Sequence, residues 1–295
     1  MAVRCGVDRT EKAGSAGAEE GFPGETPGAP GSDSKLKEGV TMELWTQAHG
    51  RTLLPAIVVM ALIAAILRLT LGKKPLKIRM IPFQILACLL VVLEIGKQVL
   101  SLREGYDLYH LPFHFCSMFI FLPPLMAFYR GKFARTVSCI TAATTGALFL
   151  LMVIYPNLIY SADNIKNFFT GFFDFHTVAF HNVAMMEFVL ILALDLHAPA
   201  PKGETKKVLL FILGFCTVSA SMAHLLKTNF NNFYTCNIAP LETVRLSVEM
   251  ALGTTAAAIF YVLIVTALDL LFVSGTYWLY RLLRRLITKK SKIEV

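Results

Sequence analysis

Charged residues are scarce in this chain of 295 residues. Asp, Glu, Lys and Arg make up only 16% of it, whereas 55% is hydrophobic and the mean hydropathy is +0.59. Such a composition excludes a water-soluble globular protein. The sequence also lacks a nucleic-acid-binding motif, so we attribute the net charge of +8 to membrane topology and expect no nucleic acid partner.

Paired cysteines and an N-terminal signal peptide are missing as well. The six cysteines form no C-x-x-C pair, which argues against a disulfide framework or a zinc knuckle; our main interpretation therefore includes no cofactor or metal. No basic start is followed by an apolar run, as a signal peptide requires. Residues 1–44, rich in Gly and Pro, bury too little apolar surface to offset ordering entropy, which predicts a disordered tail.

Long apolar runs fill the rest of the chain. Seven stretches are each about long enough to cross the roughly 30 Å hydrocarbon core as a helix. Lipid offers no partner for backbone N–H and C=O groups, so these stretches must be helical. We predict an all-α, polytopic helical bundle over residues 45–285 with about seven transmembrane spans: Leu53–Leu71, Met80–Leu100, Pro112–Tyr129, Thr136–Ile154, Thr177–Leu196, Val208–Leu226 and Thr255–Tyr280.

Basic residues gather in every second connection between these spans. Seventeen lie in one set of connections and five in the other, and the positive-inside rule then places the N-terminus outside and the C-terminus, with a basic tail over 286–295, in the cytoplasm. The larger set is Arg68, Lys73, Lys74, Lys77, Arg79, Arg130, Lys132, Arg135, Lys202, Lys206, Lys207, Arg281, Arg284, Arg285, Lys289, Lys290 and Lys292.

Polar side chains inside the spans are few, and they share one membrane half. Ionisable groups in lipid are costly and usually mark function. Here they lie in the non-cytoplasmic half or just outside it, which predicts a single polar pocket. The residues are Glu94, Lys97, His110, His114, Cys116, His176, His181, Glu187, His224, Asn229, Asn231, Asn232 and Cys236.

Several of these residues also have a purely structural interpretation. Glu94 and Lys97 are spaced i, i+3 and can simply neutralise each other on one helix face. His224 suits a hydrogen-bonding role at a helix end. Asp269, deep in the last span, fits either a helix–helix hydrogen bond or a proton-linked role.

The segment His110–Cys116 is the most informative part of the sequence. Pro112 suits the first turn of a helix, so we expect the third span to begin there. On that helix His114 and Cys116 would point about 200° apart. A nucleophilic Cys116 would therefore need an imidazole from another helix, and His181 on the same membrane side is the natural candidate. Without such a partner, a lone membrane cysteine is usually a packing residue.

Four motifs resemble the YwaF-like integral membrane protein family over roughly residues 50 to 285. They are Leu111-Pro112-Phe113-His114-Phe115-Cys116, Tyr155-Pro156-Asn157, Phe175-His176 with Phe180-His181, and Asn229-Phe230-Asn231-Asn232-Phe233-Tyr234. The last of these, with Cys236 and Pro240, is also similar to the animal transmembrane protein 164 acyltransferase family. More distant relatives are the androgen-induced fatty-acid-ester hydrolases.

This resemblance implies a Cys/His pair that acts on lipid acyl esters, with membrane phospholipids as acyl donor and acceptor. Cys116 would attack the acyl carbonyl, His181 would be the general base, and His114 or Asn231 would support the oxyanion. We expect Asn229, Asn231, Glu187 and His176 to contact the substrate. Where the animal family has a cysteine next to the histidine, this chain has Phe113 and Phe115.

Other interpretations remain open at this stage. His110, His114, His176 and His181 could supply ligands to a zinc ion that activates water. A transporter or lipid-binding protein could line a polar path with Glu94, Glu187 and Asp269. Cys116 and Cys236 could instead form a disulfide. The membrane would be the plasma membrane of a bacterium or an endomembrane of a eukaryote, and nothing in the sequence indicates the oligomeric state.

Overall fold

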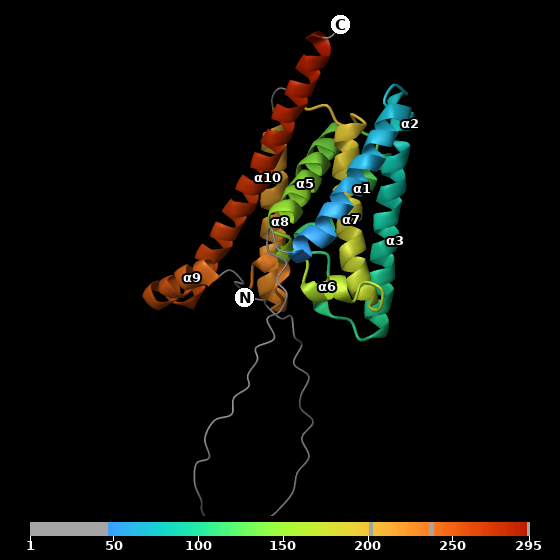
Figure 1. Ribbon diagram of the computed structural model, residues 1–295. Coiled ribbons are helices and arrows are strands. Elements are labelled where there is room, and N and C mark those ends of the chain that lie inside the picture. The colour runs from blue at the N-terminus through green and yellow to red at the C-terminus, as the bar shows by residue number, and fades with distance from the viewer. Residues whose placement is uncertain (1–46, 201–202, 236–238, 294–295) are drawn as a thin grey trace, which may run out of the picture.

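The computed structural model describes residues 47–200, 203–235 and 239–293, and this part of the chain is helical, with no strand (Figure 1). The predicted disordered tail over 1–44 and Cys236 lie outside the described residues. The elements, with η for 3-10 helices, are α1 Gln47–Leu71, α2 Leu76–Arg79, α3 Ile81–Arg103, η1 Leu108–His110, η2 Phe115–Ile120, α4 Leu122–Phe128, α5 Ala134–Ile154, η3 Pro156–Leu158, α6 Ala162–Lys166, α7 Phe172–Ala193, α8 Glu204–Leu226, η4 Phe230–Asn232, α9 Ala239–Leu252 and α10 Thr254–Ile293.

Six candidate membrane spans are present in the described part of the chain. They are Arg51–Leu71, Leu76–Arg103, Ala134–Ile154, Phe172–Ala193, Glu204–Leu226 and Thr254–Arg285. Each contains most or all of one predicted span. The all-α, polytopic membrane fold is therefore confirmed, and the protein is an integral, multi-pass membrane protein.

The remaining predicted span, Pro112–Tyr129, is not one continuous α-helix, and that expectation is wrong. Pro112 lies in a tight turn closed by the bond from Phe113 N–H to the carbonyl of Leu111, His114 is extended, η2 follows, and only Leu122–Phe128 is α-helical. The physical reason is Pro123-Pro124, because neither residue has an N–H to donate to a carbonyl in the preceding turn. An α-helix can accommodate them only in its first turn, which is where they stand in α4.

This broken segment still runs from one end of the bundle to the other, antiparallel to α3. Gln84 Nε2, near the start of α3, donates to the carbonyl of Ala127 at the end of α4 over 3.1 Å. Ser101 Oγ, near the end of α3, lies 2.6 Å from His110 Nδ1, before η2 begins. Six residues of 3-10 helix and seven of α-helix span about 22 Å, somewhat less than a hydrocarbon core.

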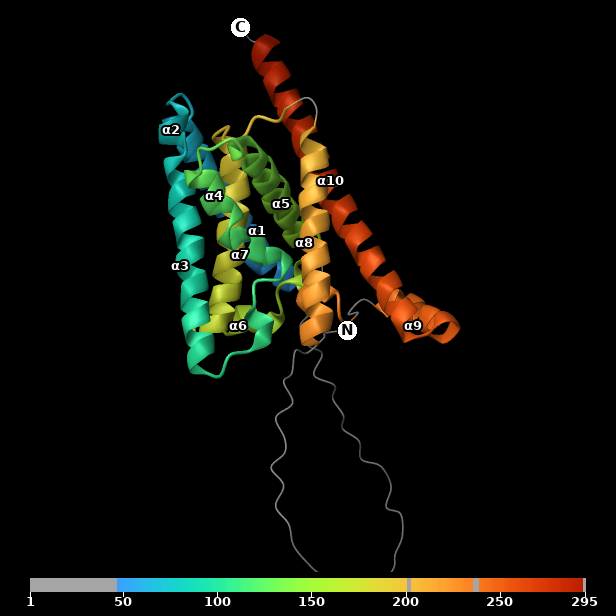
Figure 2. The ribbon, with the colours of Figure 1, turned by 180° about the vertical axis from the view of Figure 1, so that it is seen from behind.

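Figures 1 and 2 show the two ends of the bundle. We call the end where α6 and α9 lie the α6 end, and the opposite end, with α2 and the last turns of α10, the α2 end. The chain begins α1 near the α6 end and finishes α10 at the α2 end, as an odd number of crossings requires. The predicted orientation, with the basic connections of the α2 end in the cytoplasm, stays a prediction.

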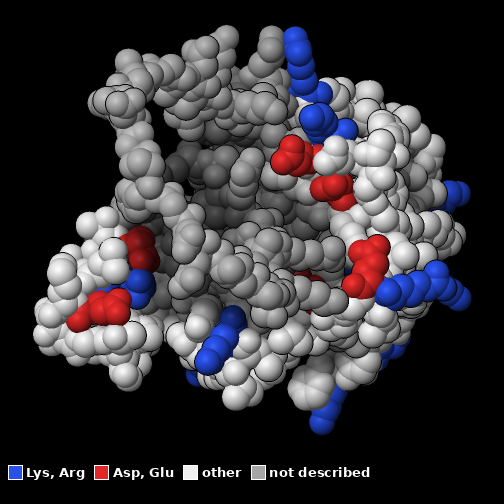
Figure 3. All heavy atoms as spheres, turned by 90° about the horizontal axis from the view of Figure 1, so that it is seen from below, with Lys and Arg blue, Asp and Glu red and all other residues white. Residues whose placement is uncertain are grey.

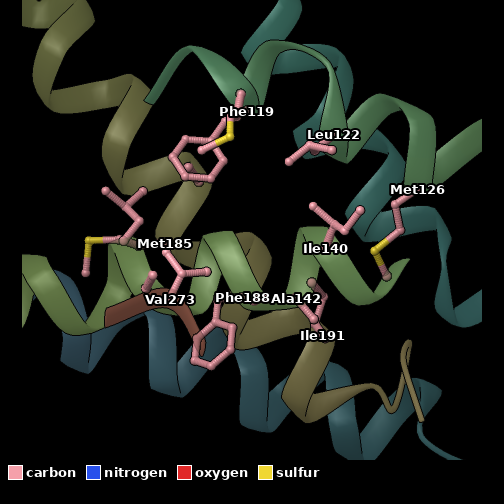
Figure 4. Packing of buried hydrophobic residues seen from close by; sticks show 14 of the residues in the cluster. Phe119, Leu122, Met126, Ile140, Ala142, Met185, Phe188, Ile191 and Val273 are labelled. Atoms are coloured by element: carbon pink, nitrogen blue, oxygen red, sulfur yellow. The ribbon is translucent and has the colours of Figure 1, made fainter. Parts of the chain in front are cut away.

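The core lies where α1, α3 and α5 pack against α7 and where α4 packs against α3 and α5 (Figure 4). The buried run from Cys139 to Leu148 in α5 consists mostly of small residues, which lets neighbouring helices approach closely. Its hydroxyls are satisfied locally, since Thr141, Thr144 and Thr145 each donate to a carbonyl one turn earlier. A Cβ placed on Gly146 would come within 2.8 Å of Cε2 of Phe188 on α7. A larger residue at position 146 would therefore have to displace the Phe188 ring or one of the two helices.

An ion cluster joins four elements at the α2 end. Asp195, just after α7, accepts from Arg68 of α1 and from Arg284 of α10. Arg79 of α2 donates to the carbonyl of Leu194 over 2.6 Å and lies 4.0 Å from the same carboxylate. Partial burial acts to raise the pKa of Asp195, but the guanidinium groups of Arg68 and Arg284 outweigh it and lower that pKa. The cluster thus fixes the C-terminal end of α7 to α1 and α10.

The α6 end carries charges of both signs in its visible part (Figure 3). Arg103, the last residue of α3, is exposed, as are Glu104 and Asp107 after it. On α9 the guanidinium of Arg245 binds Glu242 at 2.6 Å and Glu249 at 2.9 Å. The same helix also exposes apolar side chains, among them Met250 and Leu252. This end therefore differs from the predominantly basic α2 end.

Candidate functional site

The centre of the candidate site is Glu94, a buried carboxylate in the second half of α3. Its Oε1 lies 2.7 Å from Lys97 Nζ and accepts from Gln98 Nε2 at 2.7 Å. Its Oε2 lies 3.5 Å from Nε2 of His176, which is buried on α7. The expected neutralisation of Glu94 by Lys97 is confirmed, and the carboxylate additionally links α3 to α7.

Hydrogen bonds extend this cluster to the loop after α3. Gln98 donates to the carbonyl of His110 over 2.8 Å and accepts from Tyr106 Oη over 2.8 Å. The ring of His110 stacks on Phe173 at the start of α7, with centroids 5.1 Å apart. Burial, followed by the charge of Lys97, lowers the pKa of His110. The neutral imidazole therefore serves as a packing and hydrogen-bonding group that fixes the loop over the end of the bundle.

Cys116 is the second residue of η2, and its thiol is half-buried and free. Because this segment is 3-10 helical and begins after His114, the angular separation expected for an α-helix does not apply here. Lys97 and Glu94 both act electrostatically on Cys116, and η2, which carries the thiol, packs against α3, which carries the Glu94 cluster. Cys236, its partner in the alternative disulfide, lies outside the described residues.

His181 lies on α7, where its ring is buried between Tyr160 and Phe180. Its Nδ1 is 2.6 Å from the carbonyl of Thr177, so this nitrogen carries the hydrogen and donates it. Nε2 then holds a lone pair, and within the described residues it has no hydrogen-bond partner. Lys97 and His176 act electrostatically on His181, so Lys97 influences both His181 and Cys116.

The two predicted oxyanion donors are engaged elsewhere. His114 Nε2 donates to the carbonyl of Tyr109 over 3.0 Å, and its ring packs on Tyr109 and Phe230. Asn231 Nδ2 donates to Asp269 Oδ2 over 2.8 Å. Asp269 also accepts from the thiol of Cys216 over 3.6 Å, which makes it a helix–helix hydrogen-bonding residue between α8 and α10.

The single pocket stays a prediction, and two of the residues expected to bind substrate have surroundings of their own. The side-chain oxygen of Asn229 accepts from the backbone N–H groups of Tyr234 and Thr235, so Asn229 closes the turn after α8. Glu187 is fully buried three helical turns beyond His176 on α7. Its two oxygens have no hydrogen-bond partner among the described residues. The periodicity of a helix predicts which side chains share a face, but not which residues of other elements they contact.

The proposed zinc site is not supported. In the part of the chain that the structure describes, no three His, Cys, Asp or Glu side chains lie close enough together to hold a metal ion. His110, His114, His176 and His181 are instead held by Ser101, by the carbonyl of Tyr109, by the contact with Glu94 and by the carbonyl of Thr177. The four imidazoles thus have separate structural partners.

Comparison with known proteins identifies the family. The sequence model of the TMEM164 family matches residues 44–277, which is more than half of the chain. The chain belongs to the TMEM164 family. No curated protein and no solved structure matches it. The matched range contains every residue of the Glu94 cluster together with Cys116 and His181, so the TMEM164 family assignment covers the whole candidate site.

Sequence reasoning overlooked a second polar cluster. At the α2 end, Ser138, His197, Glu204 and Tyr277 come from four segments and form one hydrogen-bonded chain. His197 and Glu204 lie in or beside a connection between spans, where polar residues are ordinary, so no sequence signal set them apart. Only the packing of α10 against α5 and α8 brings them together.

Proposed function

We propose that this protein is a lipid acyltransferase or acyl-ester hydrolase that uses Cys116 as nucleophile and His181 as general base. The observation that carries the proposal is the state of His181. Its Nδ1–H donates to the carbonyl of Thr177, which leaves Nε2 available as a base. The thiol of Cys116 is free, and Lys97 acts electrostatically on both residues. Both residues lie in the range that matches the TMEM164 family. Membrane phospholipids are the proposed acyl donor and acceptor.

The reaction proceeds in two steps. Sγ of Cys116 bonds to the acyl carbonyl carbon while His181 Nε2 takes the thiol proton; the ester C–O bond then breaks and the leaving alcohol receives that proton. A lysolipid hydroxyl or a water molecule next attacks the thioester, and the thiol is restored by the reverse proton path. The ammonium group of Lys97 acts electrostatically in favour of the thiolate, whereas Glu94, with which Lys97 is paired, acts against it.

The mechanism requires Cys116 to move toward His181 when substrate binds. No hydrogen bond joins Cys116 to His181 among the described residues, and the imidazole is held by Thr177. The thiol therefore has to approach the imidazole rather than the reverse. Cys116 lies in η2, next to an extended segment rather than within a long α-helix, and such a segment can shift with less disruption than a continuous helix.

Comparative lipidomics tests the proposal. Cells would express the intact protein, Cys116→Ala or His181→Ala at matched membrane abundance, and Cys88→Ala would be the control because Cys88 is an exposed cysteine on α3. We expect the intact protein and Cys88→Ala to change phospholipid acyl composition and the other two variants to lose that change. A full change in cells that express Cys116→Ala would overturn the thiol mechanism.

A transporter or lipid-binding protein is the second candidate, and Glu187 is the observation that favours it. A fully buried carboxyl group without hydrogen-bond partners among the described residues is costly within a membrane span and is a common feature of ion or proton paths. Purified protein in liposomes separates the two. A transporter gives flux that Glu187→Gln abolishes, whereas the acyltransferase gives a thioester on Cys116 that hydroxylamine cleaves.

A further inference from the structure

Four side chains at the α2 end form a continuous hydrogen-bonded chain, at the opposite end of the bundle from the Glu94 cluster. Ser138 Oγ on α5 lies 2.8 Å from His197 Nδ1, and His197 Nε2 lies 3.1 Å from Tyr277 Oη on α10. Tyr277 Oη donates to Glu204 Oε2 on α8 over 2.5 Å. His197, Glu204 and Tyr277 are buried, whereas Ser138 is half-buried. The chain therefore ends at its most accessible member, a serine.

The donors around Glu204 fix the direction of each hydrogen bond from Ser138 to Glu204. Glu204 also accepts from Arg135 Nε over 3.0 Å and from the backbone N–H of Ala200 over 2.8 Å, so it acts only as an acceptor. Tyr277 has one hydroxyl proton and gives it to Glu204, and it must therefore accept the N–H of His197 Nε2. A neutral imidazole then has its lone pair on Nδ1, where it accepts the hydroxyl proton of Ser138.

The imidazole is also rigidly held. Tyr280 Oη donates to the carbonyl of His197 over 2.6 Å, and the two rings stack with centroids 6.0 Å apart. Arg135, one helical turn before Ser138, donates to the carbonyl of Ala198 over 3.1 Å. The base thus faces the serine in a fixed tautomer and orientation, which is the arrangement that nucleophilic serine catalysis needs.

We propose that Ser138 is a second nucleophile, activated by His197 and oriented through Tyr277 and Glu204, that accepts acyl groups from amphiphilic carboxylic esters at the α2 end. Oγ bonds to the ester carbonyl carbon as His197 Nδ1 takes its proton. The ester C–O bond then breaks, and His197 returns the proton to the leaving alcohol. Water or another alcohol releases the acyl group by the same route.

Positive charge near Ser138 suits the developing oxyanion. Ser138 lies in the second turn of α5, near the positive end of that helix dipole. Arg135 is on the same helix face, and Lys207 Nζ donates to Thr136 Oγ1 over 3.1 Å. The carboxylate of Glu204, reached through Tyr277, stabilises the imidazolium that forms when His197 takes the proton.

A fluorophosphonate amphiphile, which forms a stable adduct with activated serines, tests the proposal on the full-length protein in nanodiscs. We expect peptide mapping to find the adduct on Ser138, and Ser138→Ala to lose it. Ser274→Ala is the matched control, because Ser274 is also half-buried but donates to its own helix, to the carbonyl of Leu270 over 2.6 Å. That variant should label like the intact protein.

Two further variants test the relay itself. His197→Asn should slow labelling at least about 100-fold, because it removes the base. Tyr277→Phe should slow it about tenfold, because the imidazole loses its link to Glu204. An intact, monodisperse protein without an adduct on Ser138, or an unchanged labelling rate in His197→Asn, would overturn the proposal. The Ser138 proposal does not depend on the proposed role of Cys116. If Cys116 is not a nucleophile, the lipidomic comparison will show it, and the labelling of Ser138 will not change.

Discussion

The carboxylate of Glu94 on α3 lies 3.5 Å from Nε2 of His176 on α7 while it binds Lys97 at 2.7 Å within its own helix. One buried carboxylate therefore serves both as the counter-ion of a lysine and as the link between two membrane spans. Around it lie the residues for which we propose acyl-transfer chemistry, and Glu94 and Lys97 act electrostatically on the Cys116 thiol with opposite signs.

Removing one member of the Glu94–Lys97 pair should destabilise the protein more than removing both. Glu94→Gln or Lys97→Met alone leaves a buried polar or charged group without its partner, at a cost on the order of 3 kcal/mol. The double variant removes that uncompensated group and should be the more stable. Thermal unfolding in detergent measures this. If the two single effects simply add in the double variant, the pair does not interact.

Loss of the His181 imidazole should abolish turnover without loss of the fold. We expect His181→Ala to reduce the lipid acyl change at least about 100-fold, because Nε2 is the proposed base. His224→Ala is the control, since His224 is exposed at the end of α8 and contacts only the ring of Tyr234 among the interactions described. Equal losses in the two variants would argue against a specific role for His181.

Gly146→Ala should weaken the contact between α5 and α7. The new Cβ would lie 2.8 Å from the ring of Phe188, so the helices or the ring must shift, at a cost of about 1–3 kcal/mol. The double variant Gly146→Ala, Phe188→Leu removes that clash and should recover part of the loss. Thermal unfolding again reads out the effect, and a double variant no more stable than Gly146→Ala would contradict this explanation.

The Asp195 cluster should make stability depend on acidic pH. Because Arg68 and Arg284 lower the pKa of folded Asp195, its contribution is fully present above the unfolded value of about 3.9 and is lost as pH falls through the lower folded pKa. Asp195→Asn should cost about 2 kcal/mol at pH 7, typical of hydrogen bonds to a charged group. The difference from the intact protein should shrink below pH 4.

Asp163→Asn is the control for that prediction, because Asp163 is exposed on α6 at the other end of the bundle. It should not alter the pH profile of unfolding. An Asp195→Asn profile that parallels the intact protein between pH 3 and pH 5 would show that the arginine cluster does not hold an ionised carboxylate.

The third crossing shows where sequence patterns reach their limit. Hydrophobic length predicts a span over Pro112–Tyr129, and the chain does pass from end to end of the bundle there. A continuous α-helix does not form because Pro123 and Pro124 both lack an N–H. The two prolines are visible in the sequence, but a hydropathy window counts only apolar residues. Cys116 lies in the 3-10 segment that precedes this break.

The sequence by itself determined the membrane class, the helical fold and the positions of six long helices, because lipid forces apolar segments of that length to satisfy their own backbone hydrogen bonds. It also determined the Glu94–Lys97 pair, which needs only helical spacing. Tertiary structure decided that His176 joins this pair, that Asn231 pairs with Asp269, and that Ser138 meets His197. Those contacts join distant segments, and their geometry depends on how the helices pack, which no local pattern encodes.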